Sequence, residues 1–393
     1  MELLFWILIF IVFYSYLGYG LVLFGLISLQ RLFKGKPKFD NPFDADLPDL
    51  TFVVAAYNEA DYIQEKIENG LLFDYPKSKL HHLYVTDGSD DGTDQLVNNY
   101  SWPHDVSWSV HHKSGRAGKI AAVERIMEEV NTPIVVYTDA NTMVNKGALK
   151  AIARHYQDPT VGGVAGEKRI HMEGKEAANA AGEGLYWKYE SQLKKWDSEW
   201  YSVVGAAGEL FSLRTELYQP VPKDTVIEDF YMTLKISMAG YKIKYEPEAY
   251  AVESSSASVG EELKRKIRIA AGGLQAISRL LPLLNIFKYG KLSFQYISHR
   301  VLRWTLAPIA LPLILILNLF LLGDHPIYLA TLASQIIFYL SALIGVILEG
   351  KKMKIKAFFI PYYFCVMNYA VYRGFGRFVK GSQSVVWERA KRA

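Results

Sequence analysis

The chain has 393 residues, of which 50% are hydrophobic and 21% are charged, and its formal net charge at pH 7 is only +4. Its single cysteine, Cys365, excludes an internal disulfide and a cysteine-rich metal site. The length allows one large domain with a full core beside membrane segments.

An uncharged apolar segment, Leu3–Gln30, comes first. It is longer than the ~20 residues that a membrane-spanning helix needs, and it lacks the basic leader and small-residue cleavage site of a signal peptide. We therefore expect a retained transmembrane helix at residues 1–33 and a linker at 34–49. Basic residues beside a span mark its cytoplasmic side, so the next domain is predicted to be cytosolic, at the plasma membrane. These basic residues are Arg31, Lys34, Lys36 and Lys38.

Strands and helices then alternate. Apolar, β-branched runs predict strands at Leu50–Ala56, Leu80–Val85, Val106–His111 and Ile134–Tyr137. Helical spacing predicts helices at Ala60–Leu72 and Ala117–Val130. This rhythm predicts an α/β fold with a mostly parallel sheet and helices on both faces. Ligands of such sheets bind at the carboxyl ends of the strands.

Two common phosphate-binding patterns are missing from these strand ends. Gly115–Ile120 lacks the spacing and the Ser or Thr of a P-loop, and no strand is followed by a dinucleotide-binding glycine fingerprint. ATPase and dehydrogenase functions are therefore disfavoured.

Asp139 and Asn141 follow the strand at Ile134–Tyr137. A carboxylate and a carboxamide at a strand end can face a hard cation and the phosphates that it carries. The alternative is that Asp139 only shapes a turn or caps the next helix.

Taken together, six motifs resemble the family-2 glycosyltransferases with a GT-A fold. In chain order they are Val54–Glu59, Thr86–Thr93, Gly118-Lys119, Asp139-Ala140-Asn141, Ile227–Phe230 and Arg265–Arg268. With apolar segments on both sides, the chain is similar to the membrane-embedded synthases of cellulose, hyaluronan and poly-N-acetylglucosamine. The resemblance implies a cytosolic GT-A nucleotide-sugar-binding domain at residues 50–275, inserted between N-terminal and C-terminal transmembrane helices.

The resemblance implies a set of residues that bind the nucleotide-sugar. Asp87 would accept from the uracil N–H, and Tyr57 and Glu59 would hold the base and ribose, together with Ala55. Lys119, at the start of a helix, would contact the diphosphate. Each of these has an ordinary alternative, such as a turn, a helix N-terminus or a solvated lysine.

The family's Asp-x-Asp pattern is changed here, because Asn141 stands at its second position. The resemblance implies a Mg²⁺ or Mn²⁺ cofactor bound by Asp139 and Asn141. Since an amide ligates without charge, we expect weaker metal binding than two carboxylates would give.

Asp229 is the predicted catalytic base. Inverting transfer needs a group that takes the proton of the acceptor hydroxyl. A carboxylate at the start of a helix stays ionised near free backbone N–H groups, which favours this role. The rival interpretation is a plain helix N-cap.

The acceptor-binding set implied by the resemblance comprises Gly205, Gly208, Glu209 and Glu228. Small residues at Val203–Arg214 would let an acceptor ring approach the backbone, and a packed strand is the alternative. Arg265 and Arg268 would neutralise the leaving nucleoside diphosphate. Ile269 stands where the family has Trp, whereas a literal Arg-x-x-Arg-Trp at Arg300–Trp304 is predicted as a membrane-interface anchor.

The C-terminal third is predicted to be membrane-bound. Residues 276–303 read as amphipathic helices on membrane lipids, and their basic residues interleave with apolar ones, which argues against nucleic-acid binding. Residues 304–372 hold uncharged segments at Trp304–Leu322, Ile327–Leu348 and Ala357–Tyr372. The last is short for a span, and we expect it to be re-entrant or interfacial. Residues 373–393 form a basic tail.

These features predict an inverting, metal-dependent hexosyltransferase that uses a UDP-sugar at the cytosolic membrane face to elongate and export a polysaccharide, with a possible partner export protein. The alternative is a single transfer to a lipid acceptor of the ceramide, diacylglycerol or polyprenyl-phosphate type. A third hypothesis is a membrane scaffold that has lost catalysis. The motifs report mainly on the nucleotide and name neither the sugar nor the linkage.

Overall fold

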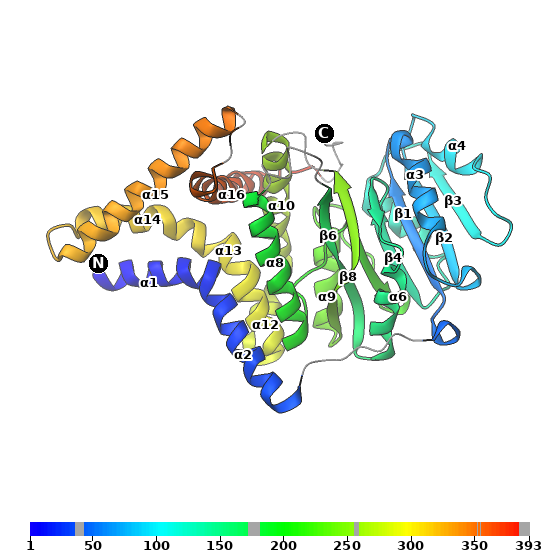
Figure 1. Cartoon of the computed structure of the whole chain (residues 1–393), viewed down its shortest axis with the longest axis horizontal. Helices are drawn as coiled ribbons and strands as arrows, with labels where there is room; N and C mark the ends of the chain where they lie inside the picture. The colour runs from blue at the N-terminus through cyan, green and yellow to red at the C-terminus, as the bar shows by residue number, and fades with distance from the viewer. Residues whose placement is uncertain (36–42, 172–180, 255–258, 352, 354, 385–393) are drawn as a thin grey trace. The chain divides into compact units, whose positions relative to one another are not determined.

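The computed structural model describes residues 1–35, 43–171, 181–254, 259–351, 353 and 355–384 (Figure 1). The chain divides into two compact units. The sheet unit comprises Gln30–His171, Lys194–Ser255 and Ser384–Ala393, and the helical unit comprises Met1–Leu29, Met172–Leu193 and Ser256–Gln383. The two units therefore interleave along the chain instead of following one another as consecutive domains.

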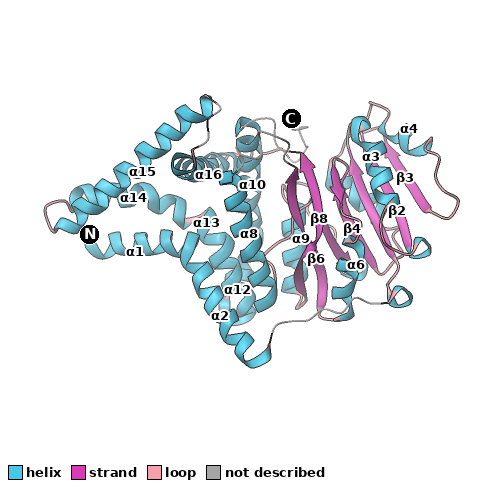
Figure 2. Cartoon of the chain, in the orientation of Figure 1, coloured by secondary structure: helices cyan, strands magenta, loops and turns pink. Residues whose placement is uncertain are grey.

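Four strands form the parallel half of the sheet, in the order β3-β2-β1-β4 (Figure 2). They are β1 (Leu50–Ala56), β2 (Leu80–Asp87), β3 (Ser107–Lys113) and β4 (Ile134–Asp139). All four predicted strands are confirmed, and the observed ends differ from the predicted ones by at most two residues. Ala55 of β1 is in register with Asp139 of β4, so these two strands end side by side.

The second half of the sheet continues from β4 in the order β7-β6-β8-β5. Its strands are β5 (Thr142–Val144), β6 (Val161–His171), β7 (Leu210–Arg214) and β8 (Lys242–Ser254). Strand β7 runs antiparallel to both β4 and β6, and β5 runs antiparallel to β8. Four of the seven pairings among the described residues are parallel, so the predicted α/β sheet is present but mixed.

Helices cover both faces of this sheet, as predicted. They are α3 (Ala60–Leu71), α4 (Thr93–Asn98), α5 (Lys119–Met127), α6 (Ala148–Ala153) and α9 (Glu228–Met238). Phe52 and Val54 of β1 are buried in the core that includes α3 and α6, and Val53 is buried in the core that includes α5 and α9. Burial on both faces explains why β1 reads as a continuous apolar run. Short 3₁₀ turns occur at Asp44–Asp46, Lys77–Lys79, Arg154–Gln157 and Thr215–Leu217.

The helical unit is built from long helices and short connecting ones. In chain order they are α1 (Glu2–Phe13), a π-helical segment (Tyr14–Gly18), α2 (Tyr19–Lys34), α8 (Ala181–Trp200), α10 (Val259–Arg279), a 3₁₀ turn (Leu281–Leu284), α11 (Ile286–Tyr289), α12 (Lys291–Tyr296), a second π-helical segment (Ile297–Val301), α13 (Leu302–Trp304), α14 (Leu306–Phe320), α15 (Pro326–Gly350) and α16 (Lys356–Val379). Helices α2 and α8 each continue into the sheet unit. The predicted domain boundary at residue 275 falls inside α10.

Two helices in the described part of the chain are long and apolar enough to cross a membrane, Glu2–Lys34 and Pro326–Gly350. A third span is possible if Lys291–Trp304 and Leu306–Phe320, which meet at an angle of 51°, form one bent unit. Helix α16 is continuous from Lys356 to Val379 but carries Arg373 and Arg377. The expectation that its apolar part is re-entrant or interfacial stays a prediction.

A buried carboxylate organises polar contacts within the helical unit. Glu190 of α8 pairs with His299, Arg300 and Arg303, and its nearest arginine nitrogen, from Arg300, lies 2.7 Å away. Arg303 also donates to the carbonyl oxygen of Ser15, in the first π-helical segment. The segment predicted as an interface anchor therefore has a buried acidic partner, and its arginines fix helices to one another inside this unit.

Candidate active site

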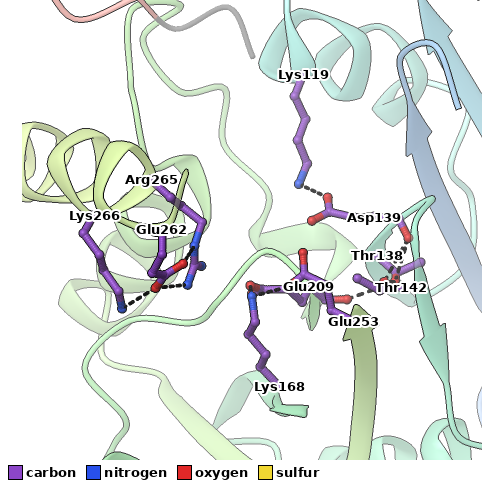
Figure 3. Close-up of polar contacts among 10 residues, drawn as sticks. All are labelled: Lys119, Thr138, Asp139, Thr142, Lys168, Glu209, Glu253, Glu262, Arg265 and Lys266. Atoms are coloured by element: carbon purple, nitrogen blue, oxygen red, sulfur yellow. Dashed lines mark hydrogen bonds and ion pairs between the residues drawn. The ribbon is translucent and has the colours of Figure 1, made fainter. Parts of the chain in front are cut away.

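Lys119 brings predicted site residues together at the carboxyl end of β4. Its Nζ donates to Asp139 Oδ1 at 2.7 Å (Figure 3). The same Nζ lies 3.5 Å from Glu228 Oε1. Lys119 is the first residue of α5, Asp139 the last of β4 and Glu228 the first of α9. Three separate elements of the sheet unit thus supply one cluster of charges.

Asp229 belongs to the same cluster, as its distance from Gly208 shows. A Cβ added at Gly208 would lie 3.3 Å from Lys119 Nζ and 3.5 Å from Asp229 Oδ2. The ammonium and the predicted catalytic carboxylate therefore both face the backbone at Gly208. A glycine keeps this small space open, and any other residue would fill it.

The glycine-rich loop is fixed against the first turn of α9. Gly205 has a φ of +83°, and a Cβ there would meet the Phe230 ring at 2.1 Å. Nearby, the backbone N–H of Ala206 donates to the hydroxyl of Thr233 at 3.1 Å. The segment is therefore a loop leading into β7, and the alternative of a packed strand over all of Val203–Arg214 is wrong for its glycine-containing part.

The N-cap interpretation of Asp229 is also wrong. Helix α9 begins at Glu228 with Ile227 at the N-cap, and Asp229 is the second helical residue. Burial and the charge of Glu228 raise the pKa of Asp229 to about 7, although Lys119 and the backbone N–H of Phe230 act in the opposite direction. The expectation that the helix start keeps this carboxylate ionised needs correction, because burial outweighs the helix start.

The neighbouring groups are shifted as well. Burial raises the pKa of Asp139, although Lys119 acts against it, and the charges of Glu209 and Glu253 raise the pKa further. Burial lowers the pKa of Lys119, but the charges of Asp139 and Glu228 outweigh burial and leave its pKa above the ordinary value. Lys119 therefore remains an ammonium ion throughout the physiological pH range.

Asp139 and Asn141 lie in a turn that is closed by hydroxyl groups. Thr142 Oγ1 donates to the carbonyl oxygen of Asp139 at 2.9 Å and lies 3.0 Å from Thr138 Oγ1. Asn141 Oδ1 is buried and accepts no hydrogen bond from the described residues. A buried amide oxygen beside a carboxylate fits a hard divalent ion that takes its other ligands from phosphates. The described residues contain no group of three or more His, Cys, Asp or Glu side chains that could hold a metal ion.

Asp87 contacts the loop that leads to Lys119. Its Oδ2 accepts from the backbone N–H groups of Ala117 and Gly118, at 2.7 and 2.6 Å. Its Oδ1 lies 3.5 Å from an Arg125 nitrogen and accepts no hydrogen bond within the described residues. One oxygen of Asp87 thus positions the start of α5, and the other is buried beside Arg125 without a hydrogen-bond donor among the described residues.

The loops after β1 and β2 are joined by polar contacts. Asn58 has a φ of 52°, and its Nδ2 donates to Asp90 Oδ1 at 2.8 Å. The backbone N–H of Glu59 donates to Thr93 Oγ1 at 3.0 Å, and the Tyr57 ring lies 3.6 Å from the Arg116 guanidinium. Tyr57 and Glu59 therefore belong to the same group of loops as Asp87, whereas Ala55 is still inside β1.

Sequence reasoning missed a buried lysine beneath the Asp139 turn. Lys66 of α3 is fully buried, and its Nζ donates to Thr138 Oγ1 at 3.1 Å and to the carbonyl oxygen of Thr142 at 2.5 Å. The buried stripe of α3 holds Ile63, Lys66, Ile67 and Gly70. A lysine within an apolar helical stripe was the signal that could have identified it.

A second missed group surrounds Glu209. Lys168 of β6 lies between Glu209 and Glu253, with its Nζ 2.6 Å from Glu209 Oε1 (Figure 3). Thr138 Oγ1 donates to the carbonyl oxygen of Glu209 at 2.9 Å, which joins this group to the Asp139 turn. No motif of the sequence pointed to Lys168 or Glu253.

Arg265 and Arg268 lie on α10, in the helical unit. Arg265 forms hydrogen bonds to Glu262 at 2.8 and 2.9 Å, and Lys266 lies 3.5 Å from the same carboxylate (Figure 3). Their contact with a nucleoside diphosphate stays a prediction.

Residues 48–272 match the family described as "Glycosyltransferase like family 2". A poly-beta-1,6-N-acetyl-D-glucosamine synthase of Staphylococcus aureus is 27% identical over 241 residues, which are 60% of this chain and 57% of the relative. The synthase of Staphylococcus epidermidis is 25% identical over 238 residues, 58% of this chain and 56% of the relative. The chain thus matches little more than half the length of these curated relatives.

The fold is also that of a solved enzyme. A mannosyltransferase from Pyrobaculum calidifontis, in complex with GDP-Man and Mn²⁺, superposes with a TM-score of 0.68 at 23% identity. The similarity covers 96% of this chain and 99% of that enzyme. The predicted GT-A fold is confirmed by this likeness together with the family match.

Proposed function

The chain belongs to the glycosyltransferase-like family 2, and we propose that it is an inverting hexosyltransferase that uses a UDP-sugar and a divalent metal at the cytosolic face of the plasma membrane. The observation that carries the proposal is the cluster at Gly208, where Lys119, Asp139 and Asp229 meet. The two or three apolar helices support membrane attachment.

Asp229 is the proposed base. Its pKa near 7 lets it exist as a carboxylate at neutral pH and still take a proton as the acceptor oxygen attacks the anomeric carbon. Glu228 and Gly208 lie beside it, and with Gly205 and Glu209 they form the proposed acceptor side of the site. The fixed contact of the loop with Phe230 supports this role, because it holds the base in one place.

Lys119 and the Asp139 turn are the proposed phosphate side. Lys119, at the amino end of α5, would bind the diphosphate, where the ammonium and the helix start both favour anions. Asp139 and Asn141 would hold Mg²⁺ or Mn²⁺, which when bound neutralises the charge on the leaving diphosphate. Arg265 and Arg268 are proposed to assist the same departure.

The nucleotide base and ribose are proposed to bind at Ala55, Tyr57, Glu59 and Asp87. The Asp87 Oδ1 supports this placement because it is buried beside Arg125 and accepts no hydrogen bond from the described residues, so an N–H from uracil would give it a donor. Guanine presents a similar N–H, and the mannosyltransferase of similar fold was solved with GDP-Man. GDP-sugars therefore belong in the donor test.

The proposed acceptor is a growing polysaccharide, supported by the similarity to poly-N-acetylglucosamine synthases, with a separate export partner possible. A single transfer to a lipid acceptor is the second candidate. It is favoured by the small number of helices in the described part of the chain that are long and apolar enough to cross a membrane.

The test is product analysis with the purified full chain in nanodiscs. UDP- and GDP-sugars are offered with Mg²⁺ or Mn²⁺, nucleotide release is followed, and the product is sized. High-mass, glycosidase-sensitive product with UDP release supports the synthase. A small organic-soluble product that forms only with added lipid supports the second candidate. Absence of nucleotide release with every donor and acceptor contradicts both.

A further inference from the structure

The Lys119 ammonium is hydrogen-bonded to the Asp139 carboxylate, which is one of the proposed metal ligands. Its Nζ is 2.7 Å from Asp139 Oδ1, and the two side chains are only 19% and 11% exposed. Charges that are shielded from water in this way are screened weakly by salt. The contact therefore persists at ordinary ionic strength, and it involves one of the two proposed metal ligands.

A divalent ion at Asp139 competes with this ammonium group. The Lys119 ammonium cancels the charge of the Asp139 carboxylate, and Asn141 adds none, so the attraction of this pair for a cation is reduced, although the charges of Glu209 and Glu253 also act on Asp139. A metal bound to the same carboxylate would also be repelled by the ammonium a few ångströms away. Glu228, 3.5 Å from Lys119 Nζ, is a second carboxylate that attracts the ammonium.

A diphosphate provides the ammonium with another partner. Lys119 is the first residue of α5, so its side chain and the free N–H groups of the helix start can bind the same anion. The lysine stem is flexible and carries three donors, which allows the ammonium to move from Asp139 to a phosphate oxygen.

We infer that Lys119 couples metal binding to donor binding: Asp139 accepts a divalent ion when the diphosphate of the donor draws the Lys119 ammonium away. The site therefore binds the metal and the nucleoside diphosphate as a pair and binds the metal alone weakly. This inference rests on the proposed function and deepens it. Because coupling is reciprocal, the metal raises nucleotide affinity by the same factor.

The test measures Mn²⁺ binding to the purified full chain in nanodiscs from the electron paramagnetic resonance signal of free Mn²⁺. Binding is measured alone, with UDP and with GDP, after subtraction of the Mn²⁺–nucleotide complex that forms without protein. Lys119→Met should bind Mn²⁺ alone about tenfold tighter than the wild type, or more. Nucleotide should raise the Mn²⁺ affinity of the wild type far more than that of the variant.

Two controls accompany this measurement. Lys150→Met removes a lysine that also lies between two carboxylates, 2.9 Å from Asp44 and 3.0 Å from Asp74, and should leave Mn²⁺ affinity unchanged. Adding Asp139→Asn to Lys119→Met should abolish the gained affinity, which locates the ion at Asp139. Lys119→Gln should show the same gain and replaces Lys119→Met if that variant does not fold.

A folded Lys119→Met and a folded Lys119→Gln that bind Mn²⁺ alone no tighter than the wild type overturn the inference. If the wild type still transfers sugar with Mn²⁺, the proposed function stands in that case. A wild-type chain that binds no Mn²⁺ with either nucleotide and transfers no sugar overturns the proposed function, and the inference with it.

Discussion

The ammonium of Lys66 donates a hydrogen bond to the hydroxyl of Thr138, 3.1 Å away and one residue before Asp139. Lys66 forms no ion pair within the described residues, although it is fully buried. Burial lowers its pKa to about 7, even though the charge of Asp139 acts in the opposite direction. A buried lysine of this kind supports the turn that carries the proposed metal ligands, at a cost in folding free energy.

The first prediction concerns this cost and its dependence on pH. Between pH 7 and the ordinary lysine pKa of 10.5, the unfolded chain binds more protons at Lys66 than the folded chain. Stability therefore rises with pH in this window, by about 1 kcal/mol per pH unit. The melting temperature of the wild type, relative to Lys66→Met, should increase from pH 7 to pH 9. A difference that stays constant over this range would contradict the lowered pKa.

The second prediction concerns Asp229. Since the base must be ionised, kcat/KM should fall about tenfold per pH unit below about pH 7. Asp229→Asn should lower kcat by at least about 100-fold without loss of the folded state. Asp105→Asn, which removes an exposed carboxylate that pairs with Lys77, serves as the matched control and should keep wild-type activity. Polymer or lipid product made by Asp229→Asn at the wild-type rate would exclude the base role.

The third prediction tests the space at Gly208. A methyl group there would lie 3.3 Å from Lys119 Nζ, which must shift by a few tenths of an ångström, and it would touch Asp229 Oδ2 at an ordinary contact distance of 3.5 Å. Gly208→Ala should therefore lower kcat about tenfold or more, with a small change in melting temperature. Gly147→Ala is the control, because a Cβ at Gly147 meets no atom within 4 Å. Equal kcat values for the two variants would show that the space at Gly208 is not needed.

The fourth prediction concerns the altered metal ligand. Asn141 Oδ1 is a buried, neutral oxygen, and Asn141→Asp adds a charge at the same position. The Mn²⁺ concentration for half-maximal transfer should fall about tenfold in Asn141→Asp, because charge count tunes divalent affinity. Asn141→Ala should raise it. An Asn141→Ala chain with the wild-type Mn²⁺ requirement would remove Asn141 from the ligand set.

The parallel half of the sheet was predictable because strands that are buried on both faces have continuous apolar sequences. Strand β1 consists almost entirely of buried apolar side chains, and β4 begins with four of them and ends in Thr138 and Asp139. The sequence pattern of the strands in the antiparallel half is weaker. Gly162, Gly163 and Gly166 interrupt β6, where a Cβ at each would approach another atom within 2.9 Å. These glycines allow close packing but interrupt the run of apolar, β-branched residues by which a strand is predicted, so β6 was not predicted from the sequence.

The candidate site was predictable where a residue type follows from the chemistry of a motif, as for Asp139 and Lys119. It was not predictable where folding decides the role. The distance between Gly208 and Asp229 depends on the loop before β7, and Lys168 meets Glu253 only through pairing of β6 with β8. The shifted pKa of Asp229 depends on burial, which local sequence does not report.

In the proposed donor site, Asp87 would link the nucleobase to the backbone that precedes Lys119. One oxygen holds the amides of Ala117 and Gly118, immediately before Lys119, and the other is buried beside Arg125 and is proposed to accept from the nucleobase. A nucleobase that fits poorly against Asp87 would therefore also displace the backbone before Lys119 and weaken the proposed binding of the diphosphate. The enzyme would then discriminate between donors in kcat as well as in binding affinity. A loss of activity on replacing Asp87 would therefore not by itself show that Asp87 recognises the base.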